Sequence, residues 1–168
     1  MKKTLTAAAL LAALLLTGCG NSGSSTESGT TADSSSTASE SDNASLSVKE
    51  KAEKVLSDIE FAGEMAEIND DNISLLGITS DGLTEYAAYI LGSSAAPDVF
   101  GIFVAENEDR AAEIKDQLST FIETRKKSFE DYTPEEMYKF DDYVIEQNGT
   151  TVYFAVTADN TAAASILK

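Results

Sequence analysis

The stretch "VFGIFVA", residues 99–105, decides the fold of this chain. Alternate residues of a strand face opposite sides of its sheet, and here neither side receives a polar side chain. The run "TVYFAVT", residues 151–157, has the same property from Val152 to Val156. An antiparallel sheet with one face in water would alternate between polar and apolar residues. The sequence therefore predicts two central strands, covered by a long helix on one face and by the N-terminal helix or a partner on the other.

Each central strand follows a second strand-like segment in the sequence. "LTEYAAYIL" (83–91) is joined to the first by a loop rich in turn residues. "DYVIEQ" (142–147) leads to the second through Asn148-Gly149, a pair typical of type I′ turns, in which both central residues need a positive φ. These patterns predict two antiparallel hairpins.

Helices are predicted around the hairpins. Ser47 and Glu50 form a capping box for an N-terminal helix that ends near Ile59. Apolar residues at three- and four-residue spacing predict a long helix over 108–129 and a C-terminal helix over 159–168. The fold class is therefore α+β: an antiparallel sheet of about four strands in two hairpins, packed with a long central helix, plus N- and C-terminal helices.

Two short helical segments complete the pattern. The first lies in "NDDNISLLG" (69–77), where we expect Asp70 or Asp71 as the cap and Gly77 as the stop. The second follows Thr133, which we expect to form a capping box with Glu136.

The N-terminus has the pattern of an export signal. Lys2 and Lys3 precede an apolar run, Leu5–Leu16, about 18 Å long as a helix, against the ~30 Å of a membrane core. Leu16-Thr17-Gly18-Cys19 closes this run and resembles the lipobox of bacterial lipoproteins. The resemblance implies that the Cys19 thiol is lipidated and that the chain is cleaved before it. The alternative is an ordinary secreted protein with an incidental cysteine.

Three regions follow from these observations. Residues 1–18 are predicted to be the lipoprotein signal peptide, and residues 19–45 the lipidated Cys19 followed by a disordered Ser/Thr-rich tether. The many hydroxyls of the tether are alternatively sites of modification. Residues 46–168 are predicted to form a single globular domain.

The charge of the chain excludes several classes of partner. Loss of the signal peptide removes Lys2 and Lys3, leaving 10 of the 12 basic residues against 29 acidic ones. Binding to nucleic acid or to an anionic membrane surface needs clustered cations. We therefore expect no nucleic acid partner, and contact with the membrane through the lipid on Cys19. The expected location is the extracytoplasmic face of the cell membrane.

The residue inventory argues against familiar catalytic chemistry. The chain has no histidine, and its one cysteine is Cys19. A Ser-His-Asp triad, a Cys-His pair and the usual zinc site therefore lack a required residue. The segment Asn69-Asp70-Asp71-Asn72 does not continue as a calcium loop, because Ile73 stands where an oxygen ligand is needed. We expect no catalytic residues, no cofactor and no metal.

One cluster of cations stands out. Arg125, Lys126 and Lys127 lie close to Tyr132 and form a candidate partner-binding patch for an anionic wall polymer, a carboxylate ligand or an acidic partner. The structural alternative is that these cations favour the dipole at the helix C-terminus, with Arg125 paired to a buried carboxylate.

The segment "RKKSFEDYTPEE" (125–136), with its spacing of Arg125, Phe129, Tyr132 and Pro134, resembles an uncharacterised family of small bacterial lipoproteins. That family is a domain of unknown function found mainly in Gram-positive anaerobes, and the resemblance covers roughly residues 68–168. It implies location and fold but assigns no activity.

Two functions remain open. The first is a non-catalytic extracytoplasmic module that binds an unknown protein or envelope polymer, using the sheet face that the long helix leaves free. The second is a small-ligand-binding accessory protein for a transporter. A deep apolar pocket would favour the second function, and an exposed apolar sheet face the first.

Overall fold

The computed structural model describes Asn43 and residues 45–168. The predicted signal peptide, Cys19 and nearly all of the predicted tether lie outside the described residues. Asn43 already contacts the domain, because its side-chain amide donates to the carbonyl of Ser165 at 3.1 Å.

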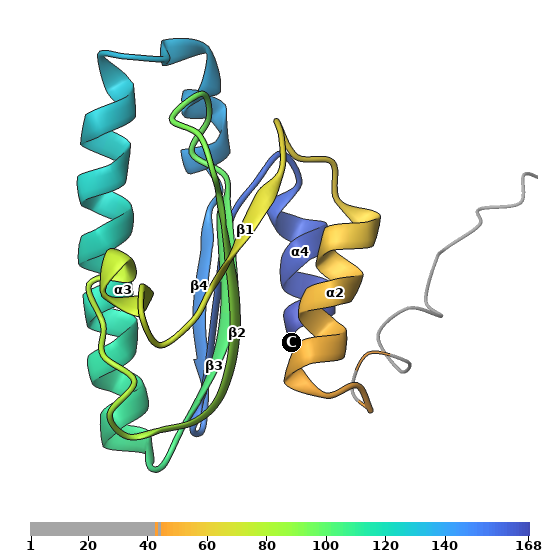
Figure 1. Cartoon of the computed structure of the whole chain (residues 1–168), viewed down its shortest axis with the longest axis vertical. Helices are drawn as coiled ribbons and strands as arrows, with labels where there is room; N and C mark the ends of the chain where they lie inside the picture. The colour runs from red at the N-terminus through yellow and green to blue at the C-terminus, as the bar shows by residue number, and fades with distance from the viewer. Residues whose placement is uncertain (1–42, 44) are drawn as a thin grey trace, which may run out of the picture. The chain divides into compact units, whose positions relative to one another are not determined.

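The described residues form three layers, with a sheet between α3 on one side and α2 and α4 on the other (Figure 1). In chain order the elements are α2 (Val48–Asp58), β1 (Met65–Ile68), the 3₁₀ helix η1 (Ile73–Leu76), β2 (Leu83–Leu91), β3 (Val99–Ala105), α3 (Glu108–Glu130), the 3₁₀ helix η2 (Pro134–Phe140), β4 (Val144–Asn148), β5 (Thr151–Val156) and α4 (Asn160–Leu167).

The sheet is antiparallel throughout, with strand order β1-β2-β3-β5-β4. The predicted α+β class, the two hairpins and the central position of β3 and β5 are confirmed. The fifth strand, β1, was not predicted. It pairs with the second half of β2, where Met65 lies opposite Leu91.

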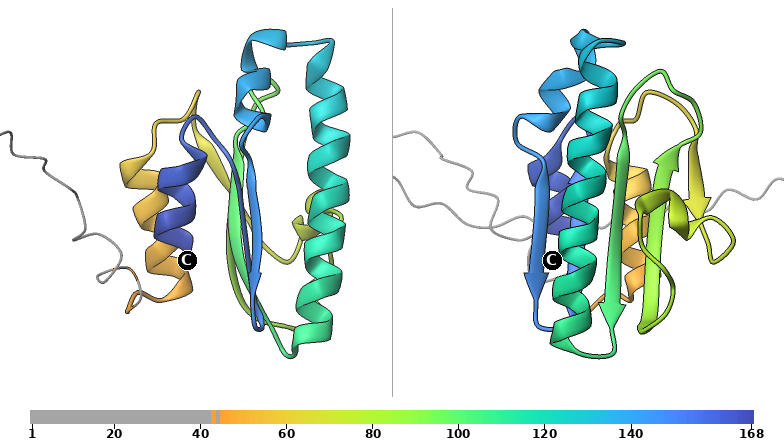
Figure 2. Two further views of the ribbon diagram at one scale, coloured as in Figure 1. Left: turned by 180° about the vertical axis from the view of Figure 1, so that it is seen from behind. Right: turned by 90° about the vertical axis from the view of Figure 1, so that its left-hand side faces the viewer.

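Helices cover both faces of the sheet (Figure 2). The face toward α3 carries the larger apolar cluster, and a second cluster lies between the other face and α2 with α4. Tyr153 and Phe154, neighbours on β5, are buried on opposite faces. The expectation of a binding surface on a free sheet face is therefore wrong, because the chain's own α2 and α4 cover the central strands there.

The close approach of aromatic rings on the α3 face requires a glycine in the central strand. A Cβ atom at Gly101 would lie 2.7 Å from the Cβ of Ala88 and 3.1 Å from the ring of Phe154. Phe103 and Phe154 stack beside it with ring centroids 6.1 Å apart. The missing side chain at 101 thus makes room for this stack.

The predicted helix starts had mixed outcomes. The Ser47–Glu50 capping box is confirmed, since each residue's side chain bonds to the other's backbone N–H. The Thr133–Glu136 box is wrong: Thr133 makes no capping hydrogen bond, and Glu136 pairs instead with Lys139. This segment is a 3₁₀ helix, and the carboxylate of Glu136 forms an ion pair with Lys139 instead of capping the backbone.

The start of the other short helix and the position of the hairpin turn also differ from the prediction. Asn72, rather than Asp70 or Asp71, precedes η1, which ends at Gly77 with a φ of 74° as expected. In the second hairpin Asn148 pairs with Thr151, so the two central turn residues are Gly149 and Thr150. Gly149 has a φ of 59°. Glycine first in the turn is the preference of type II′ turns, so the predicted turn lies one residue too early.

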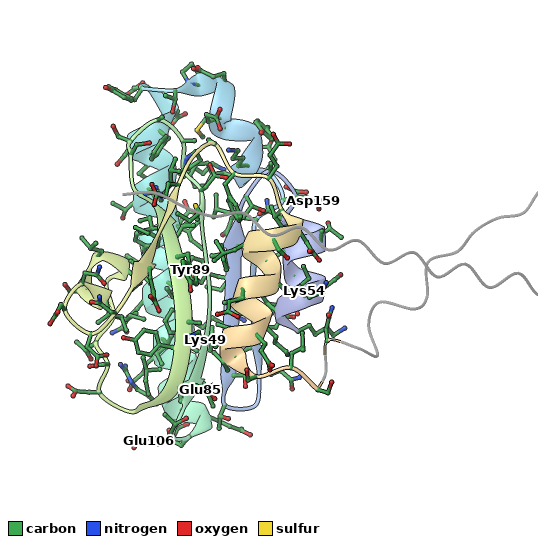
Figure 3. The ribbon with its side chains drawn as sticks, turned by 45° about the vertical axis from the view of Figure 1, so that its right-hand side comes forward. Lys49, Lys54, Glu85, Tyr89, Glu106 and Asp159 are labelled. Carbon is green, nitrogen blue, oxygen red and sulfur yellow. The ribbon has the colours of Figure 1, made fainter. Side chains whose placement is uncertain are left out.

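On the α2 side of the domain, three aromatic rings stack beside β2. Figure 3 shows this side, with Lys49 and Lys54 on α2 and Tyr89 on the neighbouring strand β2. Phe100 is fully buried there, with Tyr89 stacked on it at 5.5 Å and Phe61 at 5.7 Å. Tyr89 and Phe61 are half-buried, so their rings lie at the edge of the apolar cluster between the sheet and α2 with α4.

Candidate functional site

The predicted patch lies where α3 ends and η2 turns back beside it (Figure 2). We call residues 125–140 the α3–η2 tip. The chain reverses at Tyr132 and Thr133, whose backbone N–H groups both donate to the carbonyl of Phe129. Phe129 and Phe140 are buried, with ring centroids 6.4 Å apart, and join the tip to the core of the α3 face. The tip is therefore a packed part of the domain.

Arg125 points into the domain. Its Nε donates to the carbonyl of Pro97 at 3.0 Å, and its guanidinium carbon lies 5.0 Å from the centre of the Phe129 ring. Burial lowers the pKa of Arg125, and the nearby charge of Asp98 opposes this shift. The guanidinium thus bonds to the loop between β2 and β3. This contact favours a structural role for Arg125 over a role in binding a partner at the surface.

The other three predicted patch residues differ in their accessibility. Lys126 is half-buried, Lys127 is exposed, and 73% of Tyr132 is exposed. The structure adds Tyr138, which is 52% exposed on η2 and was not predicted. The spacing of residues 125–132 could not reveal it, because Tyr138 reaches the tip only through the chain reversal.

A buried ion pair lies beneath this surface. Lys139 Nζ is 2.8 Å from Asp98 Oδ2 and 2.8 Å from Glu136 Oε2, and the side chains of Lys139 and Asp98 are almost completely buried. Desolvation lowers the pKa of Lys139, but the hydrogen bonds and charges of the two carboxylates outweigh it and raise that pKa. The predicted buried carboxylate therefore exists, but its direct partner is Lys139 instead of Arg125.

Asn160, at the start of α4, extends this network. Its side-chain amide donates to the carbonyl of Lys139 at 2.9 Å and to Asp142 Oδ1 at 3.1 Å. Its Oδ1 accepts a hydrogen bond of 2.7 Å from the backbone N–H of Thr157. The tip is thus tied to the β2–β3 loop by Asp98 and to the start of α4 by Asn160.

A separate groove of about 350 Å³ lies between η1 and α3. Leu75, Phe121 and Thr124 contribute to its lining, which includes no charged residue, and Leu75 is 59% exposed. The groove is open to solvent, unlike the deep pocket expected of a small-ligand carrier.

Two further tests concern the described part of the chain. Across Asn43 and 45–168, no group of three or more Cys, Asp or Glu residues is arranged to hold a metal ion. Within the same residues, no helix combines the length and the apolar character that a membrane span requires.

The architecture defines the class of protein: a small α+β domain whose five-stranded antiparallel sheet is covered by helices on both faces. The chain belongs to the DUF4358 family, a domain of unknown function, whose family model matches residues 57–157. The match includes the whole α3–η2 tip and the ion pair, and it leaves out most of α2 and all of α4. No curated protein and no solved structure matches the chain.

Proposed function

We propose that this protein is a lipoprotein held at the outer face of the cell membrane by acyl chains on Cys19. The observation that carries this proposal is the lipobox-like sequence Leu16–Cys19 directly after the apolar run. One acyl chain binds a membrane only marginally, whereas two or three hold a protein stably, at ~0.8 kcal/mol per buried CH₂.

We further propose that the domain is a non-catalytic binding module for a protein or envelope polymer. The residue inventory supports this, since the chain has no histidine and its one cysteine is assigned to the lipid. The packed α3–η2 tip, with its exposed tyrosines, offers a surface for a partner. The alternative is a small-ligand-binding accessory protein for a transporter. That function gives no direct reason for tyrosines exposed at the surface of the tip.

The location is tested by replacing the lipid acceptor. In cells that produce the full chain, Cys19→Ala should abolish labelling with an alkyne-bearing fatty acid, because the only thiol is gone. It should also move the protein out of the mature membrane fraction. Ser25→Ala, in the Ser/Thr-rich segment, is the matched control and should leave both readouts unchanged. Continued acyl labelling of the Cys19→Ala protein would refute the anchor.

A further inference from the structure

We propose that the α3–η2 tip is a docking surface for a cationic protein surface, rich in Lys and Arg. This inference rests on the proposed binding function and gives that function a site and a partner chemistry. It reverses the sign expected from Arg125–Lys127, which favoured an anionic ligand.

The first support is the position of exposed aromatic side chains. Among Asn43 and 45–168, three large apolar side chains are exposed: Leu75, Tyr132 and Tyr138. Two of these three therefore belong to the tip. Tyrosine is enriched among the residues that contribute most of the binding energy at protein interfaces, because it combines a large apolar ring with a polar hydroxyl.

The second support is the charge around these tyrosines. Residues 130–138, "EDYTPEEMY", contain four carboxylates and no basic residue. Glu136 bonds to Lys139, whereas Glu130, Asp131 and Glu135 are exposed. Of the four cations of the tip, Arg125 bonds to the carbonyl of Pro97 and Lys139 is buried. The half-buried Lys126 and the exposed Lys127 remain, and Lys127 lies in the last turn of α3, where the helix dipole favours it. The surface next to the tyrosines is thus acidic, and its electrostatic complement is a cationic partner.

The third support is that the surface is held in place before binding. Lys139 bonds to Asp98, Asn160 donates to the carbonyl of Lys139, and Phe140 is buried. These contacts fix η2 from within and leave Tyr138 exposed. Little ordering entropy is then lost on binding, which favours affinity.

The fourth support is where the chain enters the domain. Figure 1 shows the start of α2 at one end of the sheet and the turn between α3 and η2 at the other end. Anchoring through Cys19 would attach the domain at the end where α2 begins. The tip would then be open to a partner.

A charge-matched binding experiment tests the proposal. The full lipidated chain is placed in phosphatidylcholine vesicles, which carry no net charge, and its affinity for a fluorescent oligolysine peptide is measured. Neutralising the tip with Glu130→Gln, Asp131→Asn and Glu135→Gln should weaken binding about tenfold, as expected for three exposed carboxylates.

The matched control removes the same charge elsewhere, with Glu60→Gln, Glu64→Gln and Glu85→Gln, three exposed residues outside the tip. It should change the affinity less than about twofold. Equal losses in the two triple variants would show that bulk charge alone attracts the peptide, and would overturn the proposal. Tyr132→Ser with Tyr138→Ser should also weaken binding, whereas Leu75→Ser should not.

Photo-cross-linking in the producing cells separates this proposal from the proposed function. p-Benzoylphenylalanine at position 132 should give a cross-link to a protein whose contacting peptide is rich in Lys and Arg. A cross-link to an acidic peptide, to an envelope polymer or to a second copy would overturn the cationic partner while leaving a binding function. Cross-links at position 75 but not at 132 would overturn the tip as the site. Absence of a cross-link at both positions would count against the binding function itself.

Discussion

Two buried lysines, Lys139 in η2 and Lys51 in α2, have opposite pKa shifts. Lys139 is 3% exposed, and Lys51, in α2, is 8% exposed. Lys139 contacts the carboxylates of Asp98 and Glu136. Lys51 donates to the peptide carbonyl oxygen of Leu167 at 3.3 Å and to the oxygen of Lys168 at 2.7 Å.

The difference in partners explains the difference in pKa. Desolvation lowers the pKa of both ammonium groups, because burial disfavours the charged form. For Lys139 two carboxylates outweigh this effect and raise the pKa, whereas for Lys51 desolvation dominates and the pKa is lowered. The carboxylates of Asp98 and Glu136 therefore account for the raised pKa of Lys139, and desolvation accounts for the lowered pKa of Lys51.

The two lysines also differ in what they join. Lys139 links η2 to the β2–β3 loop, two segments 41 residues apart in the chain, and lies within the residues matched by the DUF4358 model. Lys51 links α2 to the end of α4, outside the match. The ion pair therefore belongs to the part of the fold that the family model describes.

The largest expected effect comes from breaking the ion pair. Lys139→Met keeps the aliphatic stem but leaves Asp98, which is fully buried, without its ammonium partner. Removing one member of a buried pair costs about 3–5 kcal/mol of unfolding free energy. Chemical denaturation of the purified variant and of the wild type would measure this loss.

The double variant Lys139→Met with Asp98→Asn is the control. It removes both charges, so it should recover much of the stability that the single variant loses. If Lys139→Met is as stable as the wild type, the charge of Arg125 is sufficient to stabilise the buried carboxylate of Asp98 without Lys139.

The sequence predicted the elements better than the contacts between them. The central strands β3 and β5 follow from continuous apolar runs, and the long helix α3 follows from apolar residues at three- and four-residue spacing. Strand β1 was missed because "MAEI" has only four residues and its polar Glu67 interrupts the apolar pattern. It becomes a strand by pairing with β2.

The candidate site was predicted only in part, for a similar reason. A run of three cations drew attention to Arg125–Lys127, yet the buried charge that fixes the tip is Lys139, a lone lysine between two aromatic residues. Its partner Asp98 lies at the end of a loop, just before the apolar strand β3. No sequence spacing joins these residues, because the sheet and the chain reversal at Tyr132 bring them together.

A smaller effect is expected from Lys51, the buried lysine of α2. Lys51→Met removes a desolvated ammonium group that contacts Leu167 and Lys168, and it keeps the apolar stem between α2 and α4. The change in unfolding free energy should stay within about 1 kcal/mol, since apolar groups often replace buried charges at little cost. A loss comparable to that of Lys139→Met, measured by the same denaturation, would contradict the comparison.

The smallest effect is the response to pH, which distinguishes the two lysines by sign. An unfolded lysine titrates near pH 10.4. Because the folded pKa of Lys139 lies above that value, its stabilising contribution is complete below pH 10.4 and is lost as pH rises through the folded pKa. The folded pKa of Lys51 lies below it, so its unfavourable contribution is complete below the folded pKa and disappears as pH rises through about 10.4.

Between about pH 9 and 11 the two variants should therefore depart from the wild type in opposite directions. Relative to the wild type, Lys51→Met should lose stability more steeply with rising pH, and Lys139→Met less steeply. Tyr86 and Tyr153, whose pKa values are raised by burial and by hydrogen bonds to carboxylates, also titrate at high pH, but equally in all three proteins. Denaturation midpoints are measured across this range for each variant and for the wild type. Subtracting the wild-type midpoint at each pH removes the contribution of tyrosine titration. Slopes of the same sign in both variants would mean that the carboxylates beside Lys139 do not outweigh its burial.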